Sequence, residues 1–310
     1  MDMWSDARSA VVTSQTPWSA GRLGSRRGQS RLLFGQMHED AEIEREAFRG
    51  RGRVFCIASA GDTVLRISTE HDVVACDINP AQLAYAEARA NGGARRTGDA
   101  ERAMDFARVF MPLVGWECRI MEEFLALKDV SQQIEFWRSR LDTRLFRAGF
   151  DVLLSRPVLR LMYTPQLLSF LPRKFGAVMR ARWERGFALH PNAVNPYARL
   201  LLLGQSVDEP TWNAAKVEFA LGDAATYLEG CSPRSFDGFA LSNILDGATA
   251  AYRLRLQAAV RRAASDRAVV VLRSFAEPAS EAAAQAAARE RSMLWGSLEV
   301  LQAQELGAQS

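Results

Sequence analysis

The sequence predicts an α/β protein with a mostly parallel sheet, because short apolar runs that favour strands alternate with helical patterns. The runs 53–58 and 73–77 are separated by a helical stretch at 63–69. A further helix is predicted to run from Pro80, a residue that suits the first position of a helix, to residue 90. This alternation is typical of the start of a Rossmann-like sheet.

The strand pattern stops after residue 100 and returns in the last third of the chain. Between residues 101 and 203 the apolar side chains recur at helical spacing, interrupted by prolines. Three more strands are predicted at 216–221, 236–241 and 268–272. We therefore expect one sheet with a large helical insertion. The expected parts are a flexible N-terminal arm over 1–30, the first half of the sheet domain over 31–97, the insertion over 98–205 and the second half over 206–310.

The composition is ordinary for a globular protein, with 48% hydrophobic and 24% charged residues. A formal net charge of +3 is too small to predict a nucleic-acid partner without a concentrated basic face. The four cysteines form no CxxC pair and are expected to be reduced and buried. His38, His71 and His190 share no ligand spacing, so no metal site is predicted. Without a recognisable signal peptide or spanning segment, the protein is expected to be cytoplasmic.

Candidate ligand-binding residues follow four of the predicted strands. In a doubly wound sheet, ligands bind beyond the carboxyl ends of the strands. Asp77 is placed to accept hydrogen bonds from both hydroxyls of a ribose, and Asp223 from an adenine amine. As a plainer alternative, both acids could be solvated strand ends. The full set of strand-end candidates is Ala58, Ser59, Ala60, Gly61, Asp62, Asp77, Ile78, Gly222, Asp223, Ala224, Ser242 and Asn243.

The loop after the first strand distinguishes two nucleoside ligands. A dinucleotide site needs three glycines, so that a pyrophosphate can rest on the helix N-terminus. Here only Gly61 is present, and Asp62 would repel a phosphate. S-adenosylmethionine carries a sulfonium and no phosphate, so an acid in this loop is tolerable or helpful. The sequence therefore favours S-adenosylmethionine over a dinucleotide, and methyl transfer is the commonest reaction at such a site.

Several strings of the sequence resemble one family. Residues 31–36 read RLLFGQ, residues 55–61 read FCIASAG and residues 77–85 read DINPAQLAY. Later strings are FWR at 136–138, HPN at 190–192, NPY at 195–197 and LSNILD at 241–246. Over about residues 31 to 275 the chain resembles the bacterial betaine-lipid synthases, which are S-adenosylmethionine:diacylglycerol 3-amino-3-carboxypropyltransferases.

The resemblance implies attack by an acceptor hydroxyl, with diacylglycerol as the favoured acceptor, on the γ-carbon of S-adenosylmethionine, with release of 5′-methylthioadenosine. The insertion is then expected to cover the acceptor pocket. Candidate bases by position are Asp246 and His190, although Asp246 could instead cap the helix near Ala248 and His190 could cap a turn. Alternatives are the same transfer to a soluble hydroxyl or phenol, a methyltransferase, and a non-catalytic S-adenosylmethionine-binding regulatory protein.

Two further features bear on the donor and the acceptor. Gln36 and Gln82 lie in the matching strings as candidate donor contacts, and Arg31 is expected to pair with the donor's carboxylate. Residues 144–187 hold nine basic residues against two acids, a net charge of +7. Such a cationic stretch with interleaved apolar residues suits peripheral contact with an anionic membrane on its inner face. Alternatively, these arginines decorate ordinary solvated helix faces.

Overall fold

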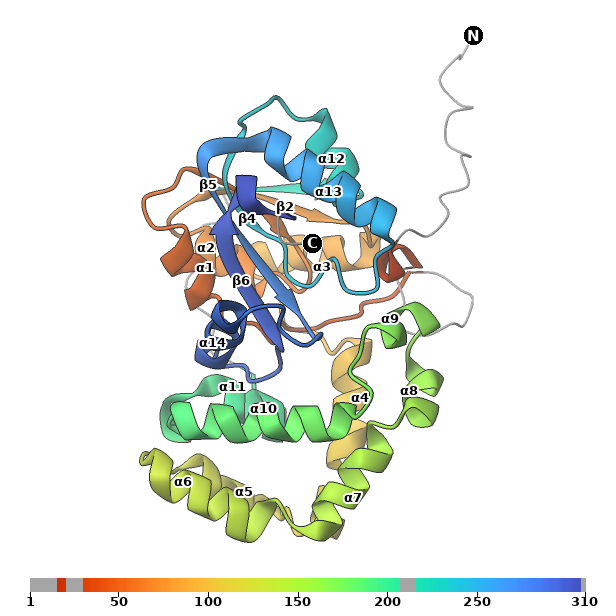
Figure 1. Ribbon diagram of the computed structural model, residues 1–310, viewed down its shortest axis with the longest axis vertical. Coiled ribbons are helices and arrows are strands. Elements are labelled where there is room, and N and C mark those ends of the chain that lie inside the picture. Colours follow the sequence, from red (N-terminus) through yellow and green to blue (C-terminus); the bar gives the residue numbers. More distant parts are fainter. Residues whose placement is uncertain (1–15, 21–29, 207–215, 308–310) are drawn as a thin grey trace.

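The computed structural model describes residues 16–20, 30–206 and 216–307. It contains a six-stranded sheet in the order β3-β2-β1-β4-β5-β6, in which only the last pairing is antiparallel (Figure 1). The predicted α/β class is therefore confirmed, and the arrangement is consistent with a Rossmann-like fold. The strands are β1 (Arg53–Ile57), β2 (Asp72–Asp77), β3 (Val217–Leu221), β4 (Phe236–Ala240), β5 (Ala264–Ser274) and β6 (Ser297–Gln302).

Helices cover both faces of the sheet, because successive side chains of a strand point to opposite faces. Phe55 packs with the helices of one face, and its neighbours Val54 and Cys56 pack with those of the other. The first face carries α12 (Ala224–Gly230) and α13 (Ala250–Ala263). The second carries α2 (Asp62–Ile67), α3 (Pro80–Ala90) and α14 (Glu281–Arg289), next to α1 (Glu42–Ala47).

Residues 99–203, the helical segment, form the lower half of the molecule in Figure 1. Their core is aromatic, with Trp116 stacked on Phe146 at 4.3 Å between ring centroids and Trp137 buried beside both rings. The segment consists of α4 (Asp99–Arg108), η2 (Met111–Val114), α5 (Cys118–Leu125), α6 (Val130–Phe136), η3 (Trp137–Leu141), α7 (Arg144–Leu153), α8 (Arg156–Met162), α9 (Pro165–Ser169), α10 (Phe175–Leu189), η4 (Asn192–Val194) and α11 (Pro196–Leu203). Helix α10 contacts α14, which joins the segment to the sheet.

The sheet order places a crevice at a definite position. The chain runs from β1 outward to β2 and β3, and then returns to β4 on the other side of β1. Loops after β1 and β4 therefore diverge, and a ligand site is expected at the carboxyl ends of these two strands. In the described part of the chain, no helix is long and apolar enough to cross a bilayer. All four cysteines are free, and Cys118 is exposed, so the expectation that every cysteine is buried is wrong for this residue.

Candidate functional site

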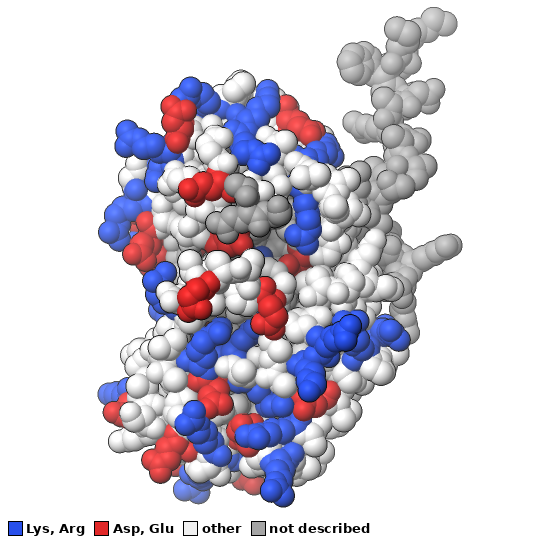
Figure 2. Space-filling view, viewed as in Figure 1, with Lys and Arg blue, Asp and Glu red and all other residues white. Residues whose placement is uncertain are grey.

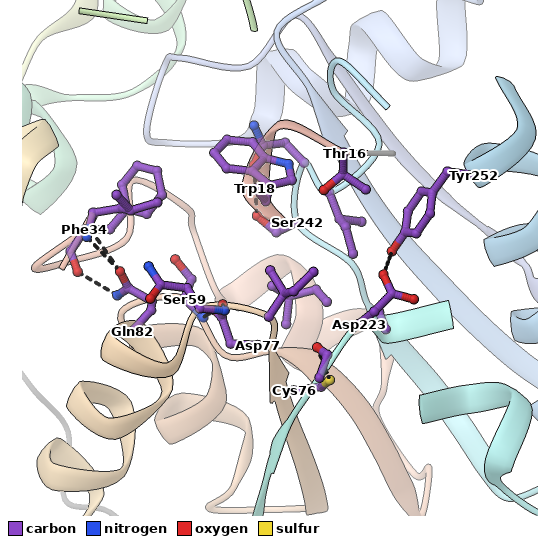
Figure 3. Close-up of a pocket in the computed structure, with 18 residues that line it drawn as sticks. Thr16, Trp18, Phe34, Ser59, Cys76, Asp77, Gln82, Asp223, Ser242 and Tyr252 are labelled. Carbon is purple, nitrogen blue, oxygen red and sulfur yellow. Dashed lines mark hydrogen bonds between the residues drawn. The ribbon is translucent and has the colours of Figure 1, made fainter. Parts of the chain in front are cut away.

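A cavity of about 650 Å³, the strand-end cleft, lies at the carboxyl ends of β1 to β4 (Figure 3). The short helix η1 (Pro17–Ala20) borders it through Trp18, with Thr16 just before the helix. Residues 1–15 and 21–29 of the predicted arm lie outside the described residues. The predicted site residues that line the cleft are Ser59, Asp77, Ile78, Gln82, Gly222, Asp223, Ala224, Ser242 and Asn243.

Asp77 is fixed at the end of β2 by backbone donors. Its Oδ2 accepts a hydrogen bond from Ser59 N at 3.0 Å, and its Oδ1 accepts one from Asn79 N at 2.9 Å. Burial raises the pKa of this carboxyl to about 6. Each oxygen keeps a second lone pair, so the carboxylate can also accept from the two hydroxyls of a bound ribose.

Of the loop after β1, Ser59 is the residue that lines the cleft. Ser59 and Gly61 adopt positive φ angles of 43° and 89°, and Gly61 precedes the first turn of α2. Ala58 and Ala60 are buried beneath the loop and do not line the cleft. Their small size nevertheless lets this tight turn pack against the sheet.

Asp62 does not point into the cleft, contrary to its predicted place among the ligand contacts. Its Oδ2 lies 3.0 Å from Arg89 Nη1 and accepts a hydrogen bond from Met37 N at 2.8 Å. Its charge is paired with the buried guanidinium of Arg89, and its hydrogen bond holds residue 37 to the start of α2.

Asp223 lies at the opposite end of the cleft from Phe34 (Figure 3). One carboxylate oxygen caps α12 by accepting from Thr226 N at 2.9 Å, and the other accepts from the Tyr252 hydroxyl at 2.6 Å. Burial, reinforced by this hydrogen bond, raises the pKa of Tyr252, so the phenol stays a donor. The capping oxygen, Oδ1, also accepts from Thr226 Oγ1 at 3.0 Å, so Asp223 is held rigidly and Oδ2 is the oxygen with a lone pair left for a ligand.

Residues 33 and 34, before α1, form one side of the cleft and are held there by Gln82 of α3. Its Oε1 accepts from Leu33 N at 3.0 Å and Phe34 N at 3.2 Å, and its Nε2 donates to Phe34 O at 2.8 Å. Gln82 therefore holds this wall in place. Arg31 does not line the cleft: it pairs with Asp99 at 2.9 Å, and its side chain is 60% exposed.

A second cavity of about 1040 Å³, the apolar cavity, adjoins the first. It is bounded by the helical segment through Met104 on α4, Leu159 on α8 and Leu167 on α9. Residues that line both cavities are Trp18, Phe34, Ser59, Ser242 and Asn243. A ligand in the strand-end cleft and one in the apolar cavity would therefore meet along this common wall.

Trp18 and His38 both line the apolar cavity with a buried ring nitrogen that has no hydrogen-bond partner among the described residues, and of the two only His38 can take up a proton. Its Nε2 has no hydrogen-bond partner among the described residues, while its carbonyl oxygen accepts from Trp295 Nε1 at 3.0 Å. Burial, helped by the positive charge of Arg108, lowers the pKa of His38 to about 4, so the ring is neutral at physiological pH. Gln36 also lines this cavity and accepts a hydrogen bond from Arg95 Nη1 at 2.9 Å.

Neither predicted base lines the strand-end cleft or the apolar cavity. Asp246 accepts from Ser274 Oγ at 2.6 Å and from Phe275 N at 3.0 Å, while Thr249 caps α13, so the helix-capping interpretation of Asp246 is wrong. His190 ends α10, and its Nε2 lies 3.1 Å from the Ala288 carbonyl oxygen. The sequence predicts no role for His38 beyond the absence of a metal-ligand spacing. The RLLFGQ string at 31–36, just before it, is the feature of the sequence that marks this segment.

A buried ionic cluster supports the common wall of the cavities. The Arg273 guanidinium donates to both carboxylate oxygens of Glu44 and lies 3.5 Å from Glu39 and 3.6 Å from Glu290. Glu39 in turn accepts a hydrogen bond from the Ser242 hydroxyl. Burial raises the pKa of Glu290 to about 7 and also raises that of Glu39. The cluster therefore holds the Ser242 side chain in place through Glu39.

The fold and the cleft together define an α/β protein with a candidate ligand site, lined by two carboxylates, at the point where its sheet order reverses. No family model, curated protein or solved structure matches the chain. Within residues 16–20, 30–206 and 216–307, no three His, Cys, Asp or Glu side chains are grouped to hold a metal ion.

Proposed function

We propose that this protein binds S-adenosylmethionine in the strand-end cleft and transfers its 3-amino-3-carboxypropyl group to the hydroxyl of diacylglycerol. The observation that carries the proposal is the common wall between a cleft that holds two carboxylates and a larger, apolar cavity. A nucleoside suits the cleft, because two separate carboxylates, Asp77 and Asp223, line it and can accept hydrogen bonds. Acyl chains suit the apolar cavity. A cytoplasmic site of action at the inner membrane face is part of this proposal.

The donor's orientation follows from the two acids. With the ribose on Asp77 and the adenine amine on Asp223, the sulfonium and its amino acid arm extend toward Ser59 and Ser242. Both of these residues also line the apolar cavity. The γ-carbon is then presented to an acceptor that arrives from the apolar side.

The transfer is a displacement at the γ-carbon. A lone pair of the acceptor oxygen forms the new C–O bond, and the electrons of the γ-carbon–sulfur bond pass to sulfur. The sulfonium charge is thereby neutralised, 5′-methylthioadenosine leaves, and the acceptor hydroxyl releases its proton. Near-linear alignment of oxygen, carbon and sulfur is required, so positioning by the common wall supplies much of the rate enhancement.

His38 takes the place of Asp246 and His190 as the proposed base. It lines the cavity proposed for the acceptor, its Nε2 has no other partner in the described chain, and the neutral ring has a lone pair for the proton. Hydrogen bonds from Met37 N to Asp62 and from Trp295 Nε1 to the His38 carbonyl fix the backbone on both sides of the ring. A base fixed in this way needs little reorganisation on proton transfer.

Identification of the nucleoside product tests the proposal. The full chain is incubated with S-adenosylmethionine and detergent-dispersed diacylglycerol, and the products are separated by chromatography and mass spectrometry. We expect 5′-methylthioadenosine and a lipid that carries the amino acid as an ether. S-Adenosylhomocysteine would instead show methyl transfer, 5′-methylthioadenosine formed only with a soluble hydroxyl or phenol would overturn the lipid acceptor, and binding without turnover would indicate a regulatory protein.

A further inference from the structure

An exposed apolar surface, the outer face, lies on the helical segment. Val109 at the end of α4 is 71% exposed, Leu113 on η2 is 72% exposed and Leu161 on α8 is 84% exposed. Phe106 and Phe110 on the same stretch of chain are also exposed and contact each other at 5.2 Å between ring centroids. Isolated exposed apolar residues are common, but a contiguous group marks an interaction site.

A shallow cavity of about 720 Å³, the hollow, lies on the same helices, and of the exposed residues named above Phe110 lines it. It is lined by Phe110 and Met111 from the end of α4 and η2, and by Gly149 and Val152 from α7. Val158 of α8 completes it, one turn before the exposed Leu161. The outer face therefore combines this apolar hollow with exposed apolar side chains on the elements that line it.

The outer face and the apolar cavity lie on opposite sides of the same helices. Leu153 lines the hollow and Leu154 lines the apolar cavity. On α8, Val158 lines the hollow and Leu159 lines the apolar cavity. On α4, Ala107 lines the hollow and Met104 lines the apolar cavity. One layer of helices thus separates the outer face from the cavity proposed for the acceptor.

Basic side chains without acidic partners accompany the outer face. Within residues 144–187, five exposed basic residues have no carboxylate partner in the described part of the chain: Arg144, Arg156, Arg160, Arg173 and Lys174. By contrast, Arg147 is paired with Asp142 and Arg180 with Asp151. Figure 2 shows basic side chains gathered on the right of the lower half, where Figure 1 places α8, α9 and the start of α10. Their unbalanced charge attracts an anionic surface.

We propose that the outer face docks on an anionic lipid bilayer, with Leu113 and Leu161 in the interfacial region and the unpaired basic residues against the headgroups. The combination of protruding apolar side chains and unbalanced positive charge is what such an interface requires. The inference deepens the proposed function and rests on it for its purpose, because a docked bilayer would present lipid acceptors beside the wall of the apolar cavity. Binding to vesicles itself needs no catalysis.

Flotation of the full chain with vesicles tests the docking. Vesicles of phosphatidylcholine are compared with vesicles that contain an equal part of phosphatidylglycerol. We expect the partition to be about tenfold stronger on the anionic vesicles and to weaken with added salt. Leu113→Asp with Leu161→Asp should lower it about tenfold, as should Arg156→Glu with Arg160→Glu. The matched control is Leu254→Asp, an exposed leucine on α13 that is 66% exposed and should leave binding unchanged.

Circular dichroism and melting temperature show that each variant is folded. Equal vesicle binding by the Leu113/Leu161 variant and the Leu254 control would overturn the inference, as would absence of binding by the parent chain. A dimer that Leu161→Asp dissociates would show that a second copy covers the face, and would also overturn it. Vesicle binding that depends on the outer face, without any 5′-methylthioadenosine, would sustain the docking while the proposed function fails.

Discussion

The two adjoining cavities are built in different ways. In the strand-end cleft, the polar side chains follow the carboxyl ends of the strands of one sheet. Backbone donors fix Asp77, and Asp223 is fixed because it caps α12. In the apolar cavity, the walls come from helices far apart in the sequence, and the imidazole of His38 has a buried nitrogen without a partner. Sheet topology therefore places the polar contacts, whereas tertiary packing of the helical segment places the apolar ones.

This contrast implies a division of labour that substitutions can test. Changes in the cleft should alter affinity for S-adenosylmethionine, and changes in the apolar cavity should alter use of the acceptor. Changes beneath the common wall should affect the folded state itself, because Arg273 supports Ser242 through Glu39.

The largest effect is expected for Arg273→Met. The substitution leaves Glu39, Glu44 and Glu290 buried without their cation, so the free energy of unfolding should fall by about 3–5 kcal/mol near neutral pH. The loss should shrink toward pH 5, because Glu39 and Glu290, whose pKa values burial raises, then bind protons and lose their charge. Urea unfolding measures it. The control Arg267→Met, an exposed residue of the same strand, should change stability by less than about 0.5 kcal/mol. Equal effects of the two substitutions would refute a supporting role for the cluster.

Replacement of His38 by Gln should affect turnover next most strongly. Glutamine keeps a similar polar side chain but cannot accept a proton, so kcat for 5′-methylthioadenosine formation should fall about 100-fold or more. The dissociation constant for S-adenosylmethionine should not change, because His38 lines the apolar cavity rather than the cleft.

The matched control for His38 is His71→Gln. His71 is also buried, but its Nδ1 lies 3.2 Å from the Arg51 carbonyl oxygen and its ring packs against Phe48, away from both cavities. Steady-state kinetics on both variants should separate them. A His38→Gln enzyme that keeps its kcat to within a factor of about three would show that another group, or water, takes the proton.

Much of the cleft could be predicted from the sequence, because its signals are local. An apolar run that ends in small residues or an acid marks the carboxyl end of a strand, and Asp77 and Asp223 both line the cleft as expected. Local signals could not show in which direction the side chain of the first residue of a helix points. Asp62 begins α2 and points to the buried Arg89, a residue that lies on another helix.

The apolar cavity could not be predicted, because it depends on long-range packing. Trp18, Leu159 and Trp295 meet around it although they are far apart in the sequence. The same dependence on residues far apart in the sequence explains why Asp246, a predicted base, does not line the cleft. Asp246 follows a strand as a cleft residue would, yet the turn after β4 aims its carboxylate at Ser274 and Phe275 instead. Such hydrogen bonds follow from the final positions of two loops rather than from either string of residues.

The pH dependence of donor binding tests the cleft directly. Burial raises the pKa of Asp77 to about 6, and only the ionised carboxylate can accept from both ribose hydroxyls while it keeps its backbone donors. As the pH falls below 6, the ionised fraction declines, so the dissociation constant for S-adenosylmethionine should rise about tenfold per pH unit. Calorimetry from pH 7.5 to 5 measures this.

Two variants control the pH series. Asp77→Asn should bind S-adenosylmethionine weakly and with little pH dependence between pH 7.5 and 5, because the titrating group is gone. Asp72→Asn changes an exposed acid at the start of the same strand and should retain the parent profile. If the Asp77→Asn profile matched that of the parent, the pH dependence would belong to a different group, and Asp77 would not be the ribose acceptor.

The smallest effect is expected for Leu159→Val, which shortens one wall of the apolar cavity by a methylene. Loss of about 0.8 kcal/mol of apolar contact should raise KM for the lipid acceptor roughly fourfold. Affinity for S-adenosylmethionine should stay the same, because Leu159 does not line the cleft. The control Leu65→Val removes the same group from a buried site on α2, and should lower stability without a change in KM. A parallel change in donor affinity for Leu159→Val would mean that the two cavities respond as one site. That outcome would contradict the division of labour between the cleft at the sheet edge and the cavity formed by helical packing.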